Sequence, residues 1–227
     1  MTSDLTVGVV RRRIDVVRNR IADAGGNPEG TTVVAVTKGF GAEVASVARA
    51  AGLLDLGENY AQELLAKAEV LATDPAAPPP RWQAIGRLQR NKVRSLAGVV
   101  ALWQSVDRLE LGAEIARRAT GAEVLVQVNV TNEPQKGGCR PGECADLVAG
   151  LGDAGLVVRG LMTVGRVGSR GETGEGFVTL ACLADRLDLP VRSMGMSDDL
   201  EEAVAAGSTM VRLGTAIFGP RPARQAP

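Results

Sequence analysis

Apolar positions along the chain alternate between helical and strand-like spacing. Residues 4–24 carry apolar side chains roughly on one helical face, and residues 25–28 (GGNP) end that pattern. Residues 32–37 then form an apolar run rich in β-branched side chains, typical of a buried parallel strand. The sequence therefore predicts an N-terminal helix that leads into a first strand.

The same succession continues along the rest of the chain. Further helices are predicted over 42–51, 60–72 and 107–119, with a short one between the third and fourth strands. The predicted strands are 32–37, 54–56, 82–85, 102–105, 123–130, 157–162, 191–194 and 209–213. Strands that alternate with helices predict an α/β protein, folded as a single (β/α)8 TIM barrel with an extra N-terminal helix and one domain over 1–227. A doubly wound open sheet is the alternative.

A barrel predicts where chemistry takes place, because functional residues lie at the C-terminal ends of its strands. Lys38 directly follows the first strand, and its neighbour Gly39 lets the backbone turn there. A lysine partly removed from water has a lowered pKa, so its amine can attack an aldehyde. Position alone, however, fits a surface lysine at the start of a loop better.

The ends of the last two strands suit an anion. Gly214 and Thr215 follow the eighth strand in a tight turn, and Ser197 follows the seventh, with Asp198 or Asp199 as a helix cap. Backbone N–H groups and hydroxyls in such turns bind phosphate, and barrels often place a phosphate site there. Each turn alone could be an ordinary connection, but the pair favours a phosphate.

Two further polar residues have alternative interpretations. Arg212 lies inside a strand, where it could bind a ring nitrogen, contact a phosphate, or pair with a carboxylate that lines the barrel. Asn59 ends the second strand, where it could donate to a ring oxygen or cap the helix that follows. Residues 89–92 (QRNK) are interpreted as a solvated helix start.

Composition narrows the class of protein. The 26 basic and 26 acidic residues balance, and aromatic residues are scarce, so we expect no nucleic-acid partner. The arginine run at 11–13 is interpreted as a solvated helix face. There is neither an apolar leader segment nor an apolar run of membrane length, so we expect a cytoplasmic protein with no membrane partner.

Residue types that are missing or few also exclude chemistry. The chain has no histidine, which removes the usual hydrolase triads and most catalytic zinc sites. Its three cysteines, Cys139, Cys144 and Cys182, include no C-x-x-C pair, so we expect neither a disulfide framework nor a structural metal.

Nine segments run in order over nearly the whole chain and form a recognisable pattern. The segments are VAVTK (34–38), GENYAQE (57–63), IGRLQRNK (85–92), SVD (105–107), QVN (127–129), EPQKG (133–137), GLMT (160–163), SMGMSD (193–198) and RLGTAIFG (212–219). Together they are far more specific than any one alone, and with them the chain resembles one family, the pyridoxal phosphate homeostasis proteins.

This resemblance implies a barrel like the alanine racemase N-terminal domain and the cofactor pyridoxal 5'-phosphate (PLP). Lys38 would be the Schiff-base lysine, and Ser197, Gly214 and Thr215 would hold the phosphate. Arg212 would lie near the pyridine nitrogen, which would disfavour its protonation and weaken the ring as an electron sink. Asn59 would contact the side of the ring that carries the 3-hydroxyl. Lys136 matches a family lysine that could help to pass the cofactor on.

Two stretches depart from the family pattern. Gln83-Ala84 stands where the family often has a histidine and an aromatic residue, and 164–171 lacks a common proline, which predicts a more mobile loop. The resemblance implies a monomeric carrier in PLP homeostasis, with PLP-dependent apo-enzymes as recipients and little or no turnover.

Two other functions are weighed against the carrier. A racemase of this fold needs a tyrosine from a second domain; only eight residues follow Gly219, Tyr60 is the sole tyrosine, and nothing places Cys139 or Cys144 at the barrel mouth. An aldolase-like lysine enzyme without cofactor would need acids beside Lys38, for which Glu58 and Asp107 are candidates.

Overall fold

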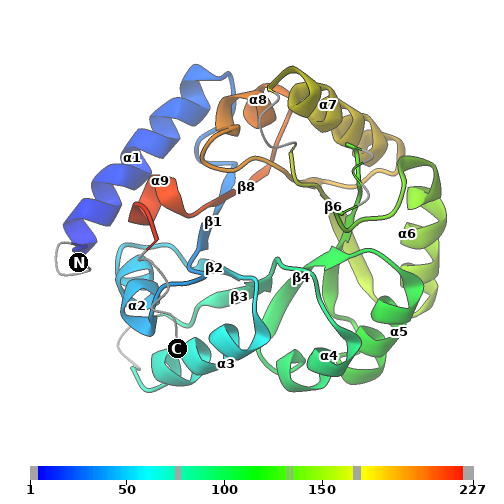
Figure 1. Cartoon of the computed structure of the whole chain (residues 1–227), viewed down its shortest axis with the longest axis horizontal. Coiled ribbons are helices and arrows are strands. Elements are labelled where there is room, and N and C mark those ends of the chain that lie inside the picture. Colours follow the sequence, from blue (N-terminus) through cyan, green and yellow to red (C-terminus); the bar gives the residue numbers. More distant parts are fainter. Residues whose placement is uncertain (1–4, 75–77, 132, 134, 166–169, 222–227) are drawn as a thin grey trace.

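The computed structural model describes residues 5–74, 78–131, 133, 135–165 and 170–221. Its strands form a closed parallel barrel in chain order, and the last strand pairs with the first. Helices surround the barrel (Figure 1). The strands are β1 (Thr32–Val36), β2 (Asp55–Glu58), β3 (Arg81–Ala84), β4 (Val100–Val106), β5 (Glu123–Gln127), β6 (Val157–Met162), β7 (Val191–Ser193) and β8 (Met210–Leu213). The predicted (β/α)8 barrel is confirmed, and the open sheet is wrong.

The helices match the predicted succession. They are α1 (Val7–Asp23), α2 (Ala42–Ala50), α3 (Ala61–Ala72), α4 (Arg90–Leu96), α5 (Leu109–Arg118), α6 (Cys144–Asp153), α7 (Arg170–Arg186), α8 (Leu200–Ala205) and α9 (Thr215–Phe218), with a 3-10 turn, η1, at Pro141–Glu143. In the described ranges, none of them has the length and apolarity to cross a bilayer.

The predicted extra N-terminal helix, α1, lies across the seam where β1 meets β8 (Figure 1). Its buried face carries Val10, Ile14, Val17 and Ile21 at helical spacing. Two arginines tie it to the end of the chain: Arg13 Nη1 donates to the Ile217 carbonyl at 2.8 Å, and Arg20 pairs with Glu201 at 2.6 Å. In the run at 11–13, Arg11 and Arg12 are exposed, as expected of a solvated face, but Arg13 is half-buried.

The core has two parts because alternate strand residues face opposite sides of the barrel wall. Outward-facing residues pack against the helices in one large apolar cluster. Inside the barrel, a small cluster contains Val34, Leu102, Leu125, Met162 and Met210. The interior of the described barrel is therefore a packed core, and the mouth at the C-terminal ends of the strands is where a ligand is expected.

One strand ends earlier than predicted. The expected strand 123–130 stops at Gln127, where the chain bonds to a returning loop. Cys139 N donates to the Gln127 carbonyl and Asn129 N donates to the Cys139 carbonyl, both at 2.9 Å. Gly138 permits this approach, since a Cβ there would lie 2.6 Å from Asn129 N. The loop after β6, which we predict to be mobile, includes 166–169, outside the described residues.

Candidate functional site

Strand periodicity carries polar side chains to the barrel mouth. Val34 faces the interior, so Val36 and Lys38 continue the same inward series. Met210 likewise faces inward, followed by Arg212 and Gly214. The inward-facing positions of each strand thus continue into the loop that follows it. Inward-facing residues from different strands therefore meet at the barrel mouth.

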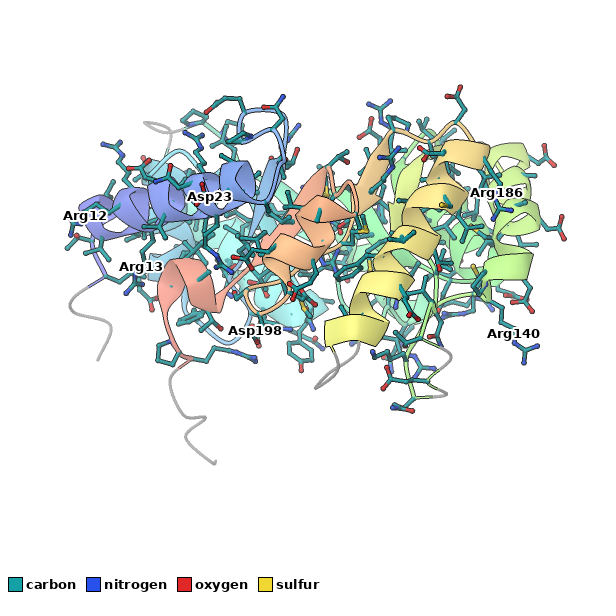
Figure 2. All side chains as sticks on the ribbon, turned by 90° about the horizontal axis from the view of Figure 1, so that it is seen from above. Arg12, Arg13, Asp23, Arg140, Arg186 and Asp198 are labelled. Atoms are coloured by element: carbon teal, nitrogen blue, oxygen red, sulfur yellow. The ribbon has the colours of Figure 1, made fainter. Side chains whose placement is uncertain are left out.

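They converge on a cavity of about 360 Å³. Its described lining is Val36, Lys38, Phe40, Asn59, Ile85, Val164, Met196, Ser197, Asp198, Arg212, Gly214, Thr215 and Arg221. The structure therefore brings together all six predicted site residues, although their role in binding stays a prediction. Figure 2 shows Asp198 at the lower edge of the barrel, whereas Arg186, the last residue of α7, lies near the upper edge.

Lys38 is half-buried in the turn after β1. Burial lowers the pKa of its amine, and the positive charges of Arg221 and Arg212 lower it further, while Glu58 has a smaller, opposite effect. Gly39 has φ +76°, a conformation that L side chains rarely adopt, and this shapes the turn. The structure therefore places a cavity-facing amine with a weakened hold on its proton, not the surface lysine that position alone suggested.

Residues on the outer face of the barrel wall support the end of β1, next to Lys38. Thr37 Oγ1 donates to Glu58 Oε1 at 2.6 Å, and Lys67 Nζ of α3 lies 2.5 Å from the same oxygen. Lys67 also donates to the Thr37 carbonyl at 2.7 Å. Burial raises the pKa of Glu58 despite its bonds to Lys67 and Thr37, and its Oε2 has no bond among the described residues. Glu58 therefore braces the site and does not line it.

Arg212 crosses the mouth from β8. Its Nη1 donates to the carbonyl and hydroxyl oxygens of Ser193 at 2.8 and 2.6 Å, and its Nη2 donates to the Thr163 carbonyl at 2.6 Å. Burial lowers its pKa to about 10, which the charge of Asp199 partly offsets. Within the described ranges no carboxylate forms an ion pair with Arg212, so these residues give no support to the interpretation as a structural ion pair.

The hydrogen bonds continue from Arg212 into the barrel. Ser193 Oγ donates to Gln104 Oε1 at 2.7 Å, and Gln104 Nε2 donates to Gln83 Oε1. Gln83 Nε2 then donates to Asp55 Oδ1 at 2.6 Å near the opposite end of the barrel. Gln83, where the sequence departs from the family pattern, is therefore buried as part of this chain of hydrogen bonds.

The loops after β7 and β8 meet where a phosphate site is predicted. Ala216 N donates to Ser197 Oγ at 3.1 Å, which joins the two loops. Gly214 lies close to β1, since a Cβ there would be 3.3 Å from the Val36 carbonyl oxygen. Asp199 is the N-cap residue of α8, but its carboxylate accepts from Met196 N at 2.5 Å instead of capping the helix. Gly214, Thr215 and Ser197 thus form one side of the cavity.

Asn59 lines the cavity at the end of β2. The N-cap of α3 is Tyr60, so the interpretation of Asn59 as the helix cap is wrong. Its backbone passes tightly by Gly86, where a Cβ would lie 2.5 Å from the Asn59 carbonyl oxygen. This contact fixes the strand end that carries Asn59.

Several candidates lie outside the cavity lining. Lys136 donates to the Gly165 carbonyl at 2.8 Å and pairs with Glu133, so it bridges the loops after β5 and β6. Cys139 and Cys144 are buried, and Asp107 pairs with Arg108. Gln89, Arg90 and Asn91 are exposed at the start of α4, as expected. In the described ranges, no group of three or more potential ligand residues is placed to hold a metal ion.

Sequence reasoning missed some lining residues. Arg221 lies beyond the last strand, where no periodicity signals an inward direction. Phe40 packs edge-to-face on Phe218, with ring centroids 5.7 Å apart, and so joins the β1 loop to α9. The only sequence signal for Phe40 and Arg221 is that they lie close in the chain to Lys38 and to the glycine-containing turn after β8.

Comparison with known proteins agrees with this geometry. The family model described as alanine racemase, N-terminal domain, matches residues 8–222. The pyridoxal phosphate homeostasis protein of Pseudomonas aeruginosa is 39% identical over 213 residues, covering 90% of this chain and 91% of the relative. The protein of the same name from Escherichia coli K12 is 34% identical, covering 90% and 94%.

A solved structure leads to the same family. PipY of Synechococcus elongatus PCC7942, with PLP bound, aligns with a TM-score of 0.76 at 30% identity, covering 89% of this chain and all of PipY (100%). The fold and the lysine-lined mouth thus define a barrel of the alanine racemase N-terminal domain class. Within that class, the chain belongs to the family of pyridoxal phosphate homeostasis proteins, which confirms the resemblance.

Proposed function

We propose that this protein binds PLP as a Schiff base on Lys38 and acts in intracellular PLP homeostasis, not in catalysis. The observation that carries the proposal is one cavity that holds both the Lys38 amine and the turns of Ser197, Gly214 and Thr215. PLP supplies an aldehyde that condenses with a primary amine with loss of water. The half-buried lysine, with its lowered pKa, suits that reaction.

The other lining residues would orient the cofactor. Gly214 and Thr215, with the Ser197 hydroxyl, would hold the phosphate through turn amides and hydroxyls. Arg212 would face the pyridine nitrogen, and because a guanidinium keeps its proton, it would donate to that nitrogen and not protonate it. Asn59 would contact the side of the ring that carries the 3-hydroxyl. The cavity is large enough, since about 360 Å³ lies in the usual range for small-ligand pockets.

Low turnover is supported by the titratable groups of the described lining, which holds Lys38 and Asp198 but neither a histidine nor a tyrosine. The chain has no histidine, and Tyr60, its only tyrosine, is half exposed at the start of α3. Glu58 faces α3 and Asp107 pairs with Arg108, so neither supports an aldolase-like site. The relatives are named as homeostasis proteins, which points the same way.

We infer further that the protein is a cytoplasmic monomer, that residues 1–227 act as one domain, and that PLP-dependent apo-enzymes receive its cofactor. The exposed large apolar side chains come from separate elements, including α1, α3, α5 and α7, which supports a monomer. Lys136, which joins two mouth loops, is the residue that we propose to assist release.

Absorbance and mass spectrometry test the proposal. The purified protein mixed with PLP should gain a visible absorption band, and borohydride should fix the added mass on Lys38. Lys38→Ala should lose both signals and remain folded, because a mouth lysine contributes little packing; Lys92→Ala is the matched control. A fixed adduct on another lysine, or a band retained in Lys38→Ala, would refute the assignment. Amino-acid racemisation by the wild type would refute the non-catalytic role.

A further inference from the structure

Arg221 reaches the cavity from beyond the last helix. Gly219 ends α9 with φ +85°, which turns the chain back toward the mouth. The side chain of Arg221 then passes over the β1 loop: a Cβ built on Gly39 would lie 3.3 Å from Arg221 Cδ. A side chain at position 39 would therefore be in close contact with Arg221, and this proximity places the stem of the Arg221 side chain beside Lys38.

The three described cations of the cavity lining differ in what they already contact. Lys38 is the amine proposed to hold the cofactor, and Arg212 donates to three oxygens of the barrel wall. Arg221 has no hydrogen bond or ion pair within the described ranges, although Asp198 lines the same cavity. Its fork of N–H donors is therefore available to a ligand.

A phosphate monoester is the ligand group that fits this donor best. A guanidinium binds phosphate through two parallel hydrogen bonds, and these charge-assisted bonds are stronger than neutral ones. The predicted phosphate contacts from Ser197, Gly214 and Thr215 are neutral, and Asp198 beside them carries a negative charge. A dianion held by these groups alone would lack a counter-charge among them, and Arg221 is a cation that lines the same cavity.

We propose that Arg221 recognises the phosphate of the bound cofactor and so makes the site prefer PLP over unphosphorylated pyridoxal. This inference rests on the proposed function and assigns its ligand selectivity to a residue outside the strands. The same charge lies close enough to Lys38 to affect the protonation of its amine. Arg221 would thus both bind the phosphate and act on the Lys38 amine.

The experiment compares Arg221→Gln, Arg221→Lys and the wild type. Dissociation constants for PLP and for pyridoxal are measured by titration of the visible band. Arg221→Gln should weaken PLP binding about tenfold or more, with little change for pyridoxal, as expected for the loss of a charge-assisted hydrogen bond. Arg221→Lys should recover part of the difference. Arg87→Gln, which removes an exposed arginine after β3 that does not line the cavity, is the matched control.

The outcomes separate this inference from the function on which it rests. If Arg221→Gln lowers the ratio of PLP to pyridoxal affinity and Arg87→Gln does not, the inference is supported. If Arg221→Gln weakens both ligands equally, or neither, the inference is overturned while the proposed function stands. If the wild type forms no adduct on Lys38, the proposed function itself has failed.

Discussion

Lys67 Nζ lies 2.5 Å from Glu58 Oε1, in an ion pair whose side chains are 5% and 0% exposed. Both members of the pair bond to Thr37, the residue directly before Lys38. Two buried charges are costly to desolvate, and removal of one partner leaves the other uncompensated. This pair is the clearest point at which stability and the site depend on the same residues.

Lys67→Met should destabilise the fold by about 3 to 5 kcal/mol at pH 7, because the buried Glu58 would lose its cation and would either stay charged without a partner or have to take up a proton. Urea denaturation measures the loss. A second change, Glu58→Gln, should recover part of it, since a neutral amide needs no counter-charge. A loss below about 1 kcal/mol in Lys67→Met would contradict the description of a buried, mutually dependent pair.

The same pair predicts a pH dependence. Burial holds the pKa of Glu58 above its usual value, so the folded state keeps this proton to a higher pH than the unfolded chain does. The contribution of Glu58 to stability therefore falls as pH rises from the usual carboxyl pKa through the raised one. The destabilisation in Lys67→Met should shrink as pH is lowered through this window, because a neutral Glu58 needs no partner. An equal loss at every pH in denaturation experiments would count against it.

Lys38 should react with amine-directed reagents at lower pH than an ordinary lysine. Burial and two nearby arginines lower its pKa, so its neutral form is populated below the usual range. The rate of labelling by an acid anhydride, read at Lys38 by mass spectrometry, should level off at lower pH than that of a free lysine amide. Identical pH profiles would show that the cavity does not perturb the amine.

Gly86→Ala should disturb Asn59. The added Cβ would lie 2.5 Å and 2.6 Å from the Asn59 carbonyl oxygen and Cα, so the backbone must move. We expect a stability loss of about 1 to 3 kcal/mol and weaker PLP binding. Gly98→Ala is the matched control, because a Cβ there meets nothing within 4 Å. Calorimetry and the absorption titration supply both readouts, and equal behaviour of the two variants would disprove the tight contact.

Gln104→Leu should cost about 1 to 3 kcal/mol, because it leaves the buried Ser193 hydroxyl without an acceptor and the buried Gln83 carbonyl oxygen without its donor. Arg212 depends on Ser193 for two of its contacts, so the visible band of the PLP adduct should also shift. Ser95→Ala, at an exposed hydrogen bond in α4, is the control for general polar loss. An unchanged band with intact stability would argue that Arg212 is held independently of Gln104.

The barrel and most of its mouth could be predicted because both follow from local patterns. Period-two spacing inside β1 and β8 already fixed the direction of Lys38 and Arg212 once a closed barrel was assumed. The partners of Arg212 could not be predicted in this way, since Ser193 and Thr163 reach it only through the register of β6, β7 and β8. The Glu58–Lys67 pair was missed for a related reason: it joins the outer face of a strand to the inner face of a helix.

The early end of β5 has a similar cause. Apolar spacing continues to 130, and Val128 N still donates to the Met162 carbonyl of β6, but Asn129 N then donates to Cys139 of the returning loop and not to a neighbouring strand. A bond across that many residues depends on how the intervening loop folds, and Gly138 (φ +123°) is the one local sign of it.

Because β8 closes against β1, the residues around the mouth come from both extremes of the polypeptide. When only the first half of the chain has been synthesised, Lys38 and Asn59 are present but the turns that face them are not. A ligand can therefore bind at this mouth only after the sheet has closed into a barrel. A molecule bound there contacts residues from both ends of the chain, so its binding free energy stabilises the closed barrel.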